Sequence, residues 1–376
     1  MPRLTFFPLG SADCCLIRLA DGRRVLFDYA NTRDPKDKDD LRCDLPKELR
    51  DDLDEAERDS YAVVAFTHLD KDHYRGASEF FWLRHAAKYQ GNGRIKMDLM
   101  WVPAAVITEE NPDEDEAKVI QAEARYRFKQ KEGIRVFSRP ERLRKWCEKN
   151  KISFEDRLPL ITDAGQVAPE FTKERDGVEF FVHCPFAKRL NATTVEDRND
   201  DALVMQATFA VDQVETKVLL MADVTYDIIA DIVDVTNRKN RETRLEWDVV
   251  KIPHHCSYTA LGPEKGEDKT KPVKQVAWLY QTQQQDNATI VSSSKPMPVK
   301  GSQEDEDDNP PHRQAGNYYK GVVEEPDDQF KVTMQHPKAS APKPLVIDID
   351  TSKATVQARA LATAAVAVST RPPRAG

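Results

Sequence analysis

The sequence predicts an α/β protein built on at least one large β-sheet, with a second sheet expected. Short runs rich in β-branched and aromatic residues recur along most of the chain, a pattern typical of buried or half-buried strands. Amphipathic helical segments separate several of these runs. A chain of 376 residues is long enough for one large domain or two ordinary ones, and it can bury a substantial core without disulfides.

The predicted strands are short and spread over most of the chain, which is why a large sheet is required. They cover residues 14–19, 24–29, 62–67, 95–102, 178–183, 202–209, 217–221, 248–252, 289–292, 330–334 and 345–349. Since no internal repeat of about 20–50 residues relates these runs, the pattern argues against a solenoid or a propeller.

Two helices are predicted between the fourth and fifth of these strands. The first begins at Asn111-Pro112, where a capping residue precedes proline at the first helical position, and it ends before Gly133. The second begins near Ser138 and turns Leu143 and Cys147 toward one face. Residues 107–165 are therefore expected to form a helical insertion that follows the chemically richest loop of the chain.

Polar, proline-containing stretches mark the expected loops and the end of the folded region. Residues 301–312 contain an unbroken acidic run and are predicted to be a surface loop. The segment 354–376 is low in complexity and is expected to be a frayed tail. Residues 1–353 are accordingly predicted to form the functional domain, with the insertion and the acidic loop as its additions.

Charge and cysteine usage restrict the compartment and the partners. With 56 Lys and Arg against 64 Asp and Glu, the net charge of −8 argues against nucleic-acid binding by bulk electrostatics, although it leaves room for a local basic groove. The six cysteines show no CxxC spacing, and the first residues lack a signal-peptide pattern. No run of about 18 apolar residues occurs, so we expect a cytoplasmic protein with free thiols and no membrane span.

The strongest chemical signal follows the predicted strand 62–67. This strand leads directly into four ligand-capable side chains within six residues: His68, Asp70, Asp72 and His73. Imidazole and carboxylate groups suit Zn²⁺, Mn²⁺ or Fe²⁺, and two ions that share one loop need such close spacing. The competing interpretation is a charged surface loop whose aspartates cap a helix.

Two later segments make the metal interpretation stronger. Strand 217–221 leads to Asp223, and strand 248–252 leads to His254 and His255, so each candidate ligand comes just after a buried strand. Taken alone, Asp223 is equally explained as the cap of the helix that follows it, and paired histidines are a weak signal. The coincidence of all three segments is what favours a metal site.

These segments together resemble the metallo-β-lactamase superfamily, whose first motif reads T-H-x-H-x-D-H. Within it, the resemblance is closest to the metallohydrolase domain of the competence protein ComEC. The matching stretches are Gly10-Ser-Ala-Asp13-Cys14, Phe27-Asp28-Tyr29-Ala30, Asn199-Asp-Asp-Ala-Leu203-Val204, Leu220-Met-Ala-Asp223 and Lys251-Ile-Pro-His254-His255-Cys256-Ser257. Their order and approximate spacing agree with that branch from about residue 5 to residue 260.

The resemblance implies a four-layer αββα sandwich with one or two divalent ions, zinc or manganese, along one edge. Carried over by position, His68 binds the first ion, Asp72 and His73 bind the second, and Asp223 bridges them. One histidine of the pair His254 and His255 completes the second site, and motif position does not decide which. The supporting residues implied by the resemblance are Asp13, Asp28 and Asn199, which orient or hydrogen-bond the metal loop.

The sequence departs from the family pattern at three positions. Asp70 stands where the family has its second histidine, and a carboxylate there favours Mn²⁺, Mg²⁺ or Fe²⁺ over Zn²⁺, or leaves the position weakly filled. Ala222 and Cys256 replace glycines that allow close approach of the backbone. These departures leave metal identity and occupancy open.

The expected function is a metal-dependent hydrolase, a phosphodiesterase or nuclease-like enzyme that uses metal-activated water. Asp72 is the candidate proton acceptor, and the candidate substrate is a phosphodiester, either nucleic acid or a nucleotide. One alternative is a catalytically degenerate fold that serves as an interaction or regulatory module. A carbon-ester or amide hydrolase is disfavoured, because no histidine- and glycine-rich third motif occurs between Val182 and Val204. Protein partners and oligomeric state are not indicated.

Overall fold

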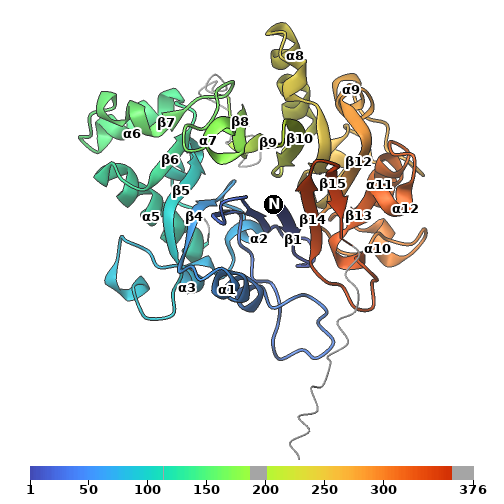
Figure 1. Cartoon of the computed structure of the whole chain (residues 1–376), viewed down its shortest axis with the longest axis horizontal. Coiled ribbons are helices and arrows are strands. Elements are labelled where there is room, and N and C mark those ends of the chain that lie inside the picture. Colours follow the sequence, from blue (N-terminus) through green and yellow to red (C-terminus); the bar gives the residue numbers. More distant parts are fainter. Residues whose placement is uncertain (113, 187–200, 358–376) are drawn as a thin grey trace, which may run out of the picture.

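The computed structural model describes residues 1–112, 114–186 and 201–357, which form two β-sheets flanked by helices (Figure 1). The first sheet has nine strands, in the order β15 (Lys353–Val356), β14 (Leu345–Asp350), β1 (Arg3–Phe6), β2 (Cys15–Arg18), β3 (Arg24–Phe27), β4 (Ser60–Ala65), β5 (Lys96–Pro103), β6 (Ile134–Phe137) and β7 (Ile161–Thr162). The second has six, in the order β13 (Phe330–Val332), β12 (Gln284–Ser292), β11 (Trp247–Lys251), β10 (Val214–Met221), β9 (Val204–Val211) and β8 (Val178–Cys184).

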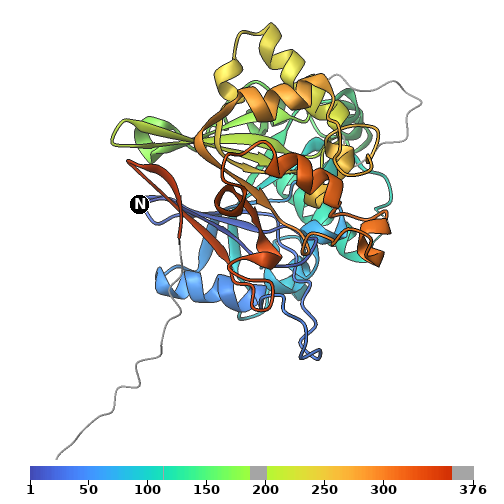
Figure 2. The same cartoon turned by 90° about the vertical axis from the view of Figure 1, so that its right-hand side faces the viewer.

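The helices lie on the outer faces of the two sheets, as Figure 2 shows from the side. Those associated with the first sheet are α1 (Leu45–Glu55), α2 (Lys71–Tyr74), α3 (Ala77–Phe80), α4 (Ala104–Thr108), α5 (Asp115–Gln130) and α6 (Glu141–Lys149). The remaining helices are α7 (Lys173–Asp176), α8 (Tyr226–Arg238), α9 (Lys274–Thr282), α10 (Gln303–Glu306), α11 (Arg313–Lys320) and α12 (Pro326–Gln329). Short 3₁₀ turns are η1 (Ala87–Tyr89), η2 (Glu155–Leu160), η4 (Glu242–Arg244), η5 (His254–Cys256), η6 (Tyr258–Ala260) and η7 (Thr333–Gln335).

Three separate hydrophobic cores establish the layering, because successive side chains of a strand point to opposite faces. In β3, Leu26 joins the core under the helices, whereas Val25 and Phe27 join the core between the sheets. In β10, Leu219 packs toward α8, whereas Val218 packs toward the other sheet. Helix, sheet, sheet and helix therefore form four layers, which confirms the predicted αββα fold class.

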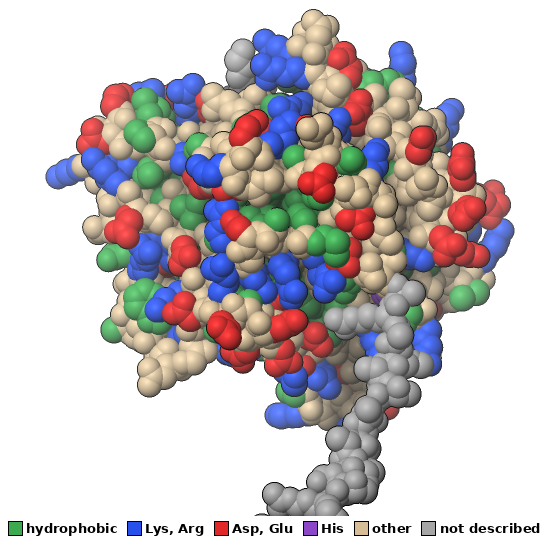
Figure 3. All heavy atoms as spheres, in the orientation of Figure 1, with side chains coloured by type: hydrophobic (Ala, Val, Ile, Leu, Met, Phe, Trp, Pro, Cys, Tyr) green, Lys and Arg blue, Asp and Glu red, His purple; other side chains and the backbone are tan. Residues whose placement is uncertain are grey.

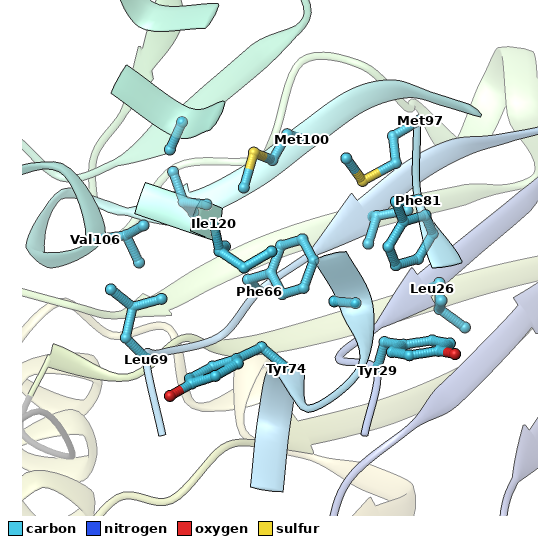
Figure 4. Packing of buried hydrophobic residues seen from close by; sticks show 14 of the residues in the cluster. Leu26, Tyr29, Phe66, Leu69, Tyr74, Phe81, Met97, Met100, Val106 and Ile120 are labelled. Carbon is cyan, nitrogen blue, oxygen red and sulfur yellow. The ribbon is translucent and has the colours of Figure 1, made fainter. Parts of the chain in front are cut away.

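The outer core of the first sheet is rich in aromatic residues and methionine (Figure 4). Phe66 and Phe81 pack edge to face with ring centroids 6.2 Å apart, and Tyr29 stacks on Phe80 at 4.7 Å. Burial of each such large side chain contributes roughly 1.5–3 kcal/mol. This packing fixes the segment between β4 and α3, which carries the His/Asp loop.

Some elements lie where the sequence pattern did not predict them. Residues 107–165 contain strands β6 and β7 in addition to α5 and α6, and β6 pairs in parallel with β5 as an extension of the first sheet. Strand β15 occupies 353–356, at the start of the predicted tail, where it pairs with β14. Helix α10 lies within the predicted acidic loop. The described part of the tail thus ends in the sheet.

Two expectations about the chain as a whole have a structural outcome. All six cysteines are free thiols, as their spacing predicted. Among residues 1–112, 114–186 and 201–357, no helix has the length and apolar character needed to cross a membrane.

Candidate metal centre

The predicted ligands come from strands of both sheets that end at one edge of the sandwich. Parallel strands β3 and β4 of the first sheet lead to Asp28 and to His68, and parallel strands β10 and β11 of the second lead to Asp223 and to His255. The carboxyl ends of parallel strands lie at the same edge of a sheet, so the loops that follow them converge. The fold therefore brings together residues that are up to about two hundred positions apart.

Four buried side chains form the tightest group: Asp13, His73, Asp223 and His255. One ligand atom from each lies within 4.8 Å of the others. His73 Nε2 is 3.4 Å from Asp223 Oδ2, and His255 Nε2 is 3.3 Å from the same oxygen. A mixed set of imidazole nitrogens and carboxylate oxygens at this spacing is suited to a divalent transition metal.

Asp13 lies closer to the centre than a supporting role requires. The resemblance implied only an orienting function for it, whereas the structure places its Oδ2 atom 3.8 Å from His73 Nε2. Its other oxygen, Oδ1, is buried and has no hydrogen-bond partner among the described residues. The Asp13 carboxylate is thus positioned as a further candidate ligand.

The remaining predicted ligands surround this group. Asp72 Oδ2 is 2.9 Å from His255 Nε2, and the Asp72 side chain is 35% exposed, far more than the 5% of Asp223. His68 Nε2 is 3.5 Å from Asp70 Oδ2, and its ring centroid is 3.9 Å from that of His73. The structure therefore brings the four predicted residues of this loop to the site, and Asp70 and Asp72 are its partly exposed carboxylates, at 33% and 35%.

Of the paired histidines, His255 enters the tight group and His254 does not. The His254 backbone N–H instead donates to Asp223 Oδ1 at 3.0 Å, so it holds the bridging candidate in place. Both residues and Cys256 have left-handed backbone conformations, with φ of 50°, 51° and 68°. Cys256 has the largest of these φ angles, in a conformation that glycine adopts at low cost.

The structure bears on the interpretation of Asp70 and Asp223 as helix caps, and it contradicts that interpretation for Asp223. Asp70 occupies the N-cap position of α2, yet its side chain makes no capping hydrogen bond. The N-cap of α8 is Thr225, whereas Asp223 accepts a hydrogen bond from the His254 backbone and lies 3.3 Å from His255 Nε2. These carboxylates therefore face the centre.

Asp28 hydrogen-bonds two residues of the loop that carries the candidate ligands. Its Oδ1 accepts the Thr67 backbone N–H at 2.8 Å, and its Oδ2 accepts the Thr67 hydroxyl at 2.7 Å and His73 Nδ1–H at 2.8 Å. A carboxylate on Nδ1 fixes the tautomer of the imidazole and leaves the lone pair of Nε2 for a ligand. Asn199, the third predicted supporting residue, lies outside the described residues.

Residues that carried no predicted role complete the support. His255 Nδ1–H donates to the Ser293 carbonyl at 2.8 Å, so its Nε2 also faces the centre. The buried Lys251 ammonium group donates to Asp13 Oδ2 and to the Met221 carbonyl. Lys251 is a charged residue within the apolar segment 247–252, and this position indicates that it pairs with a buried carboxylate. Ser293 acts through its backbone carbonyl, which no side-chain pattern reveals.

The electrostatics of the group call for added positive charge. Burial alone lowers the pKa of His73, but Asp28, Asp223 and Asp72 outweigh it and raise that pKa well above its ordinary value. Burial likewise lowers the pKa of His255, and Asp223 chiefly reverses this and raises it to about 10. The carboxylates that favour a proton on these two rings also favour a metal cation at the same place.

The residues present fit one or two divalent ions on two independent observations. His68 Nε2 and His73 Nε2 are buried and have no hydrogen-bond partner among the described residues, which is costly unless another group satisfies them. The carboxylates of Asp72 and Asp223 converge on His255 Nε2, at 2.9 Å and 3.3 Å, and they require a positive charge between them. A divalent cation meets both requirements.

Comparisons with known proteins identify no family for this chain. No protein-family model matches it, and no curated protein matches it. Among solved structures, one similar chain is described as a new diphosphatase from the PhnP family. The two chains share 8% sequence identity with a TM-score of 0.35, over 93% of this chain and 98% of that one. Similarity at this level does not indicate an activity.

Proposed function

We propose that this protein is a metal-dependent hydrolase of the metallo-β-lactamase superfamily that cleaves phosphodiesters. The observation that carries the proposal is the convergence of His68, His73 and His255 with four aspartates at the edge of an αββα sandwich. Zinc or manganese is the proposed ion, because the donor set mixes imidazole nitrogen with carboxylate oxygen. A divalent ion bound there supplies Lewis acidity, which polarises a phosphoryl oxygen and acidifies water.

The proposed ligands are His68, Asp70, Asp72, His73, Asp223 and His255, with Asp13 added from its position in the tight group. Asp28 and the Ser293 carbonyl orient two of the histidines through their Nδ1 atoms. The paired hydrogen bonds on these rings keep both Nε2 atoms pointed at the centre. Positioning of this kind limits the reorganisation that the reaction requires.

Asp72 is the proposed proton acceptor. Its side chain is 35% exposed, and its contact with His255 Nε2 holds it beside the candidate ligands. Burial tends to raise its pKa, but His73 and His255 lower the pKa well below the ordinary value, so the carboxylate stays ionised. An ionised carboxylate open to solvent is able to take a proton from an attacking water.

The proposal is tested with purified protein, elemental analysis, and hydrolysis of bis(p-nitrophenyl) phosphate in the presence of Mn²⁺ or Zn²⁺. The double variant Asp72→Ala His73→Ala is expected to lose bound metal and at least a hundredfold in kcat/KM. Asp248→Asn is the control, because Asp248 is a buried carboxylate that bonds the Lys217 backbone N–H and Lys353 Nζ instead of the candidate ligands. Absence of metal in the wild type, or unchanged activity in the double variant, would leave the interaction-module alternative in its place.

A further inference from the structure

We propose that the cleft beside the candidate metal centre selects a small phosphoester that carries a second anionic group, bound by Arg75 and Lys295, and that the cleft rejects polymeric nucleic acid. This inference rests on the proposed function and names the substrate class of the same site. It follows from the size of the cleft, from the origin of its walls and from the distribution of charge along them.

The cleft has a volume of about 610 Å³ and is lined by Asp72 itself. Pockets of roughly 300–1,000 Å³ are typical of sites for small ligands and cofactors. A mononucleotide-sized phosphoester is of this scale, whereas a nucleic-acid duplex is bound along an extended surface. The Asp72 carboxylate places the proposed proton acceptor in the wall of the cleft.

The loops that build the metal centre also supply the cations of the cleft. Arg75 follows His73 by two residues at the end of α2, and Lys295 follows Ser293, the partner of His255, by two residues. Because these segments are held by the ligands and their partners, the two cations have a fixed relation to the centre. A substrate whose scissile phosphate lies at the centre thus meets both groups with its adjoining part.

Arg75 and Lys295 are the cations in the cleft that remain available to a ligand. Arg42 pairs with Asp40 at 2.6 Å, and Lys71 pairs with Glu114 at 3.3 Å. Arg75 and Lys295 are both exposed, and no described carboxylate lies within ion-pair distance of either. Guanidinium and ammonium groups form strong charge-assisted hydrogen bonds to phosphate and carboxylate oxygens.

The acidic residues of the cleft explain why the ligand must be short. Asp37, Asp39 and Asp40 all come from one loop, between β3 and α1, and all line the same cleft. Asp40 is neutralised by Arg42, but Asp37 and Asp39 are exposed and repel a polyanion that extends past the two cations. Proteins that hold polynucleotides instead present a continuous basic surface.

The charge of the chain as a whole also disfavours a polyanion. On the face visible in Figure 3, which carries the N-terminus, acidic and basic side chains are intermixed. The net charge of −8 acts at long range, because it disfavours the approach of a polyanion. A small ligand, which displaces few counterions, needs only the two local cations.

The kinetic test compares two esters with the same leaving group in Mn²⁺-loaded protein. Bis(p-nitrophenyl) phosphate has no second anionic group, whereas thymidine 3′-phosphate 5′-(p-nitrophenyl phosphate) carries one. We expect the wild type to prefer the second ester by at least tenfold in kcat/KM, and Arg75→Gln and Lys295→Gln each to reduce this ratio about tenfold, mainly through KM. Lys274→Gln, at the start of α9 and outside the cleft, is the control and leaves the ratio unchanged.

A binding measurement separates this inference from the proposed function. Thymidine 3′,5′-bisphosphate is titrated into the metal-loaded protein by calorimetry and compared with thymidine 5′-monophosphate. The bisphosphate is expected to bind at least tenfold more tightly, and both variants to remove that advantage. Selective binding of the bisphosphate without hydrolysis of either ester would refute the proposed activity and support the anion-binding role of the cleft. Hydrolysis of both esters, with the kcat/KM ratio and the affinity advantage unchanged in both variants, would support the proposed activity and refute the role of the cleft.

A third measurement tests the exclusion of polymers. The wild type is expected to degrade single-stranded DNA at least a hundredfold less efficiently than the bisphosphate-type ester. Asp37→Asn Asp39→Asn is expected to raise DNA cleavage several-fold, because it removes the two exposed charges that oppose a longer chain. Efficient cleavage of DNA by the wild type overturns the proposed substrate class.

Discussion

Asp28→Asn is the change that most directly probes how the fold prepares the metal ligands. The Asp28 carboxylate accepts hydrogen bonds from the Thr67 backbone, the Thr67 hydroxyl and His73 Nδ1, at 2.7–2.8 Å. An amide has only one acceptor oxygen, so asparagine is unable to accept all the hydrogen bonds that the two carboxylate oxygens of Asp28 accept. If that oxygen faces Thr67 N–H, the amide NH₂ meets His73 Nδ1 and forces the other tautomer, which puts a proton on Nε2.

The magnitude follows from these contacts. A protonated Nε2 is unable to bind metal, and loss of a supporting carboxylate behind a metal-bound histidine typically costs 10–100-fold in metal affinity. This range corresponds to about 1.4–2.8 kcal/mol. If the amide turns the other way, the buried Thr67 N–H loses its acceptor, which costs roughly 1–3 kcal/mol of folding stability. Either orientation therefore gives a measurable loss.

The assay is calorimetric titration of metal-free protein with Mn²⁺ and with Zn²⁺, together with urea unfolding. Asp248→Asn is the matched control, because the Asp28 and Asp248 side chains are both 4% exposed. Asp248 accepts bonds from the Lys217 backbone and Lys353 Nζ at 2.8 Å, so its change is expected to lower stability and leave metal affinity within twofold. Metal affinity within threefold of wild type together with unchanged unfolding stability in Asp28→Asn would refute the reasoning, as would an equal loss of metal affinity in the control.

Three further outcomes are expected. Burial lowers the pKa of His183 to about 4 in the folded protein, below its unfolded value near 6.5. The free energy of unfolding therefore keeps its full contribution from neutral His183 above pH 6.5 and loses about 3 kcal/mol as the pH drops to 4. In urea unfolding, His183→Gln should show a weaker pH dependence over that interval. Arg127→Met leaves Glu123 buried without its guanidinium partner at 2.6 Å, which should cost about 3–5 kcal/mol in urea unfolding; an effect below 1 kcal/mol contradicts the pairing. Chelation with EDTA should lower the Tm of metal-loaded wild type, because a ligand at a hundred times its Kd stabilises the folded state by about 2.7 kcal/mol. An equal Tm shift in the Asp72→Ala His73→Ala variant would show that the metal binds elsewhere.

The strands that composition predicted and those that it missed differ in a physical way. Strands such as β4 and β10 bury side chains on both faces, so their sequences are dense in valine and leucine. Strands β1 and β6 have arginine or threonine between their buried positions, so neither contains an unbroken apolar run. Strand β15 buries none of its residues fully, and its pairing with β14 comes from the backbone. Such pairing leaves little trace in residue type.

The candidate site was predictable to the extent that each ligand follows its own strand. His68 and Asp223 are recognisable because each follows a predicted apolar strand within two residues, and His73 because it lies in the same cluster of ligand-capable side chains as His68. The structure brings all three together. The choice between His254 and His255 depended instead on the backbone turn after Pro253, which sequence spacing does not encode. Asp13 shows the same limit, because its distance from His73 depends on how the loop between β1 and β2 bends.

The turn that carries His255 also indicates why a cation belongs to the folded state. Three consecutive residues without a glycine, His254 to Cys256, hold positive φ angles, and such conformations cost of order 1–3 kcal/mol each. The same turn places His255 Nε2 within 3.3 Å of Asp223 and 2.9 Å of Asp72, which repel one another. A chain that keeps both the strained turn and the opposed carboxylates must recover that free energy elsewhere. A metal ion bound at the same atoms would recover it, so we expect metal affinity and folding stability to be coupled here.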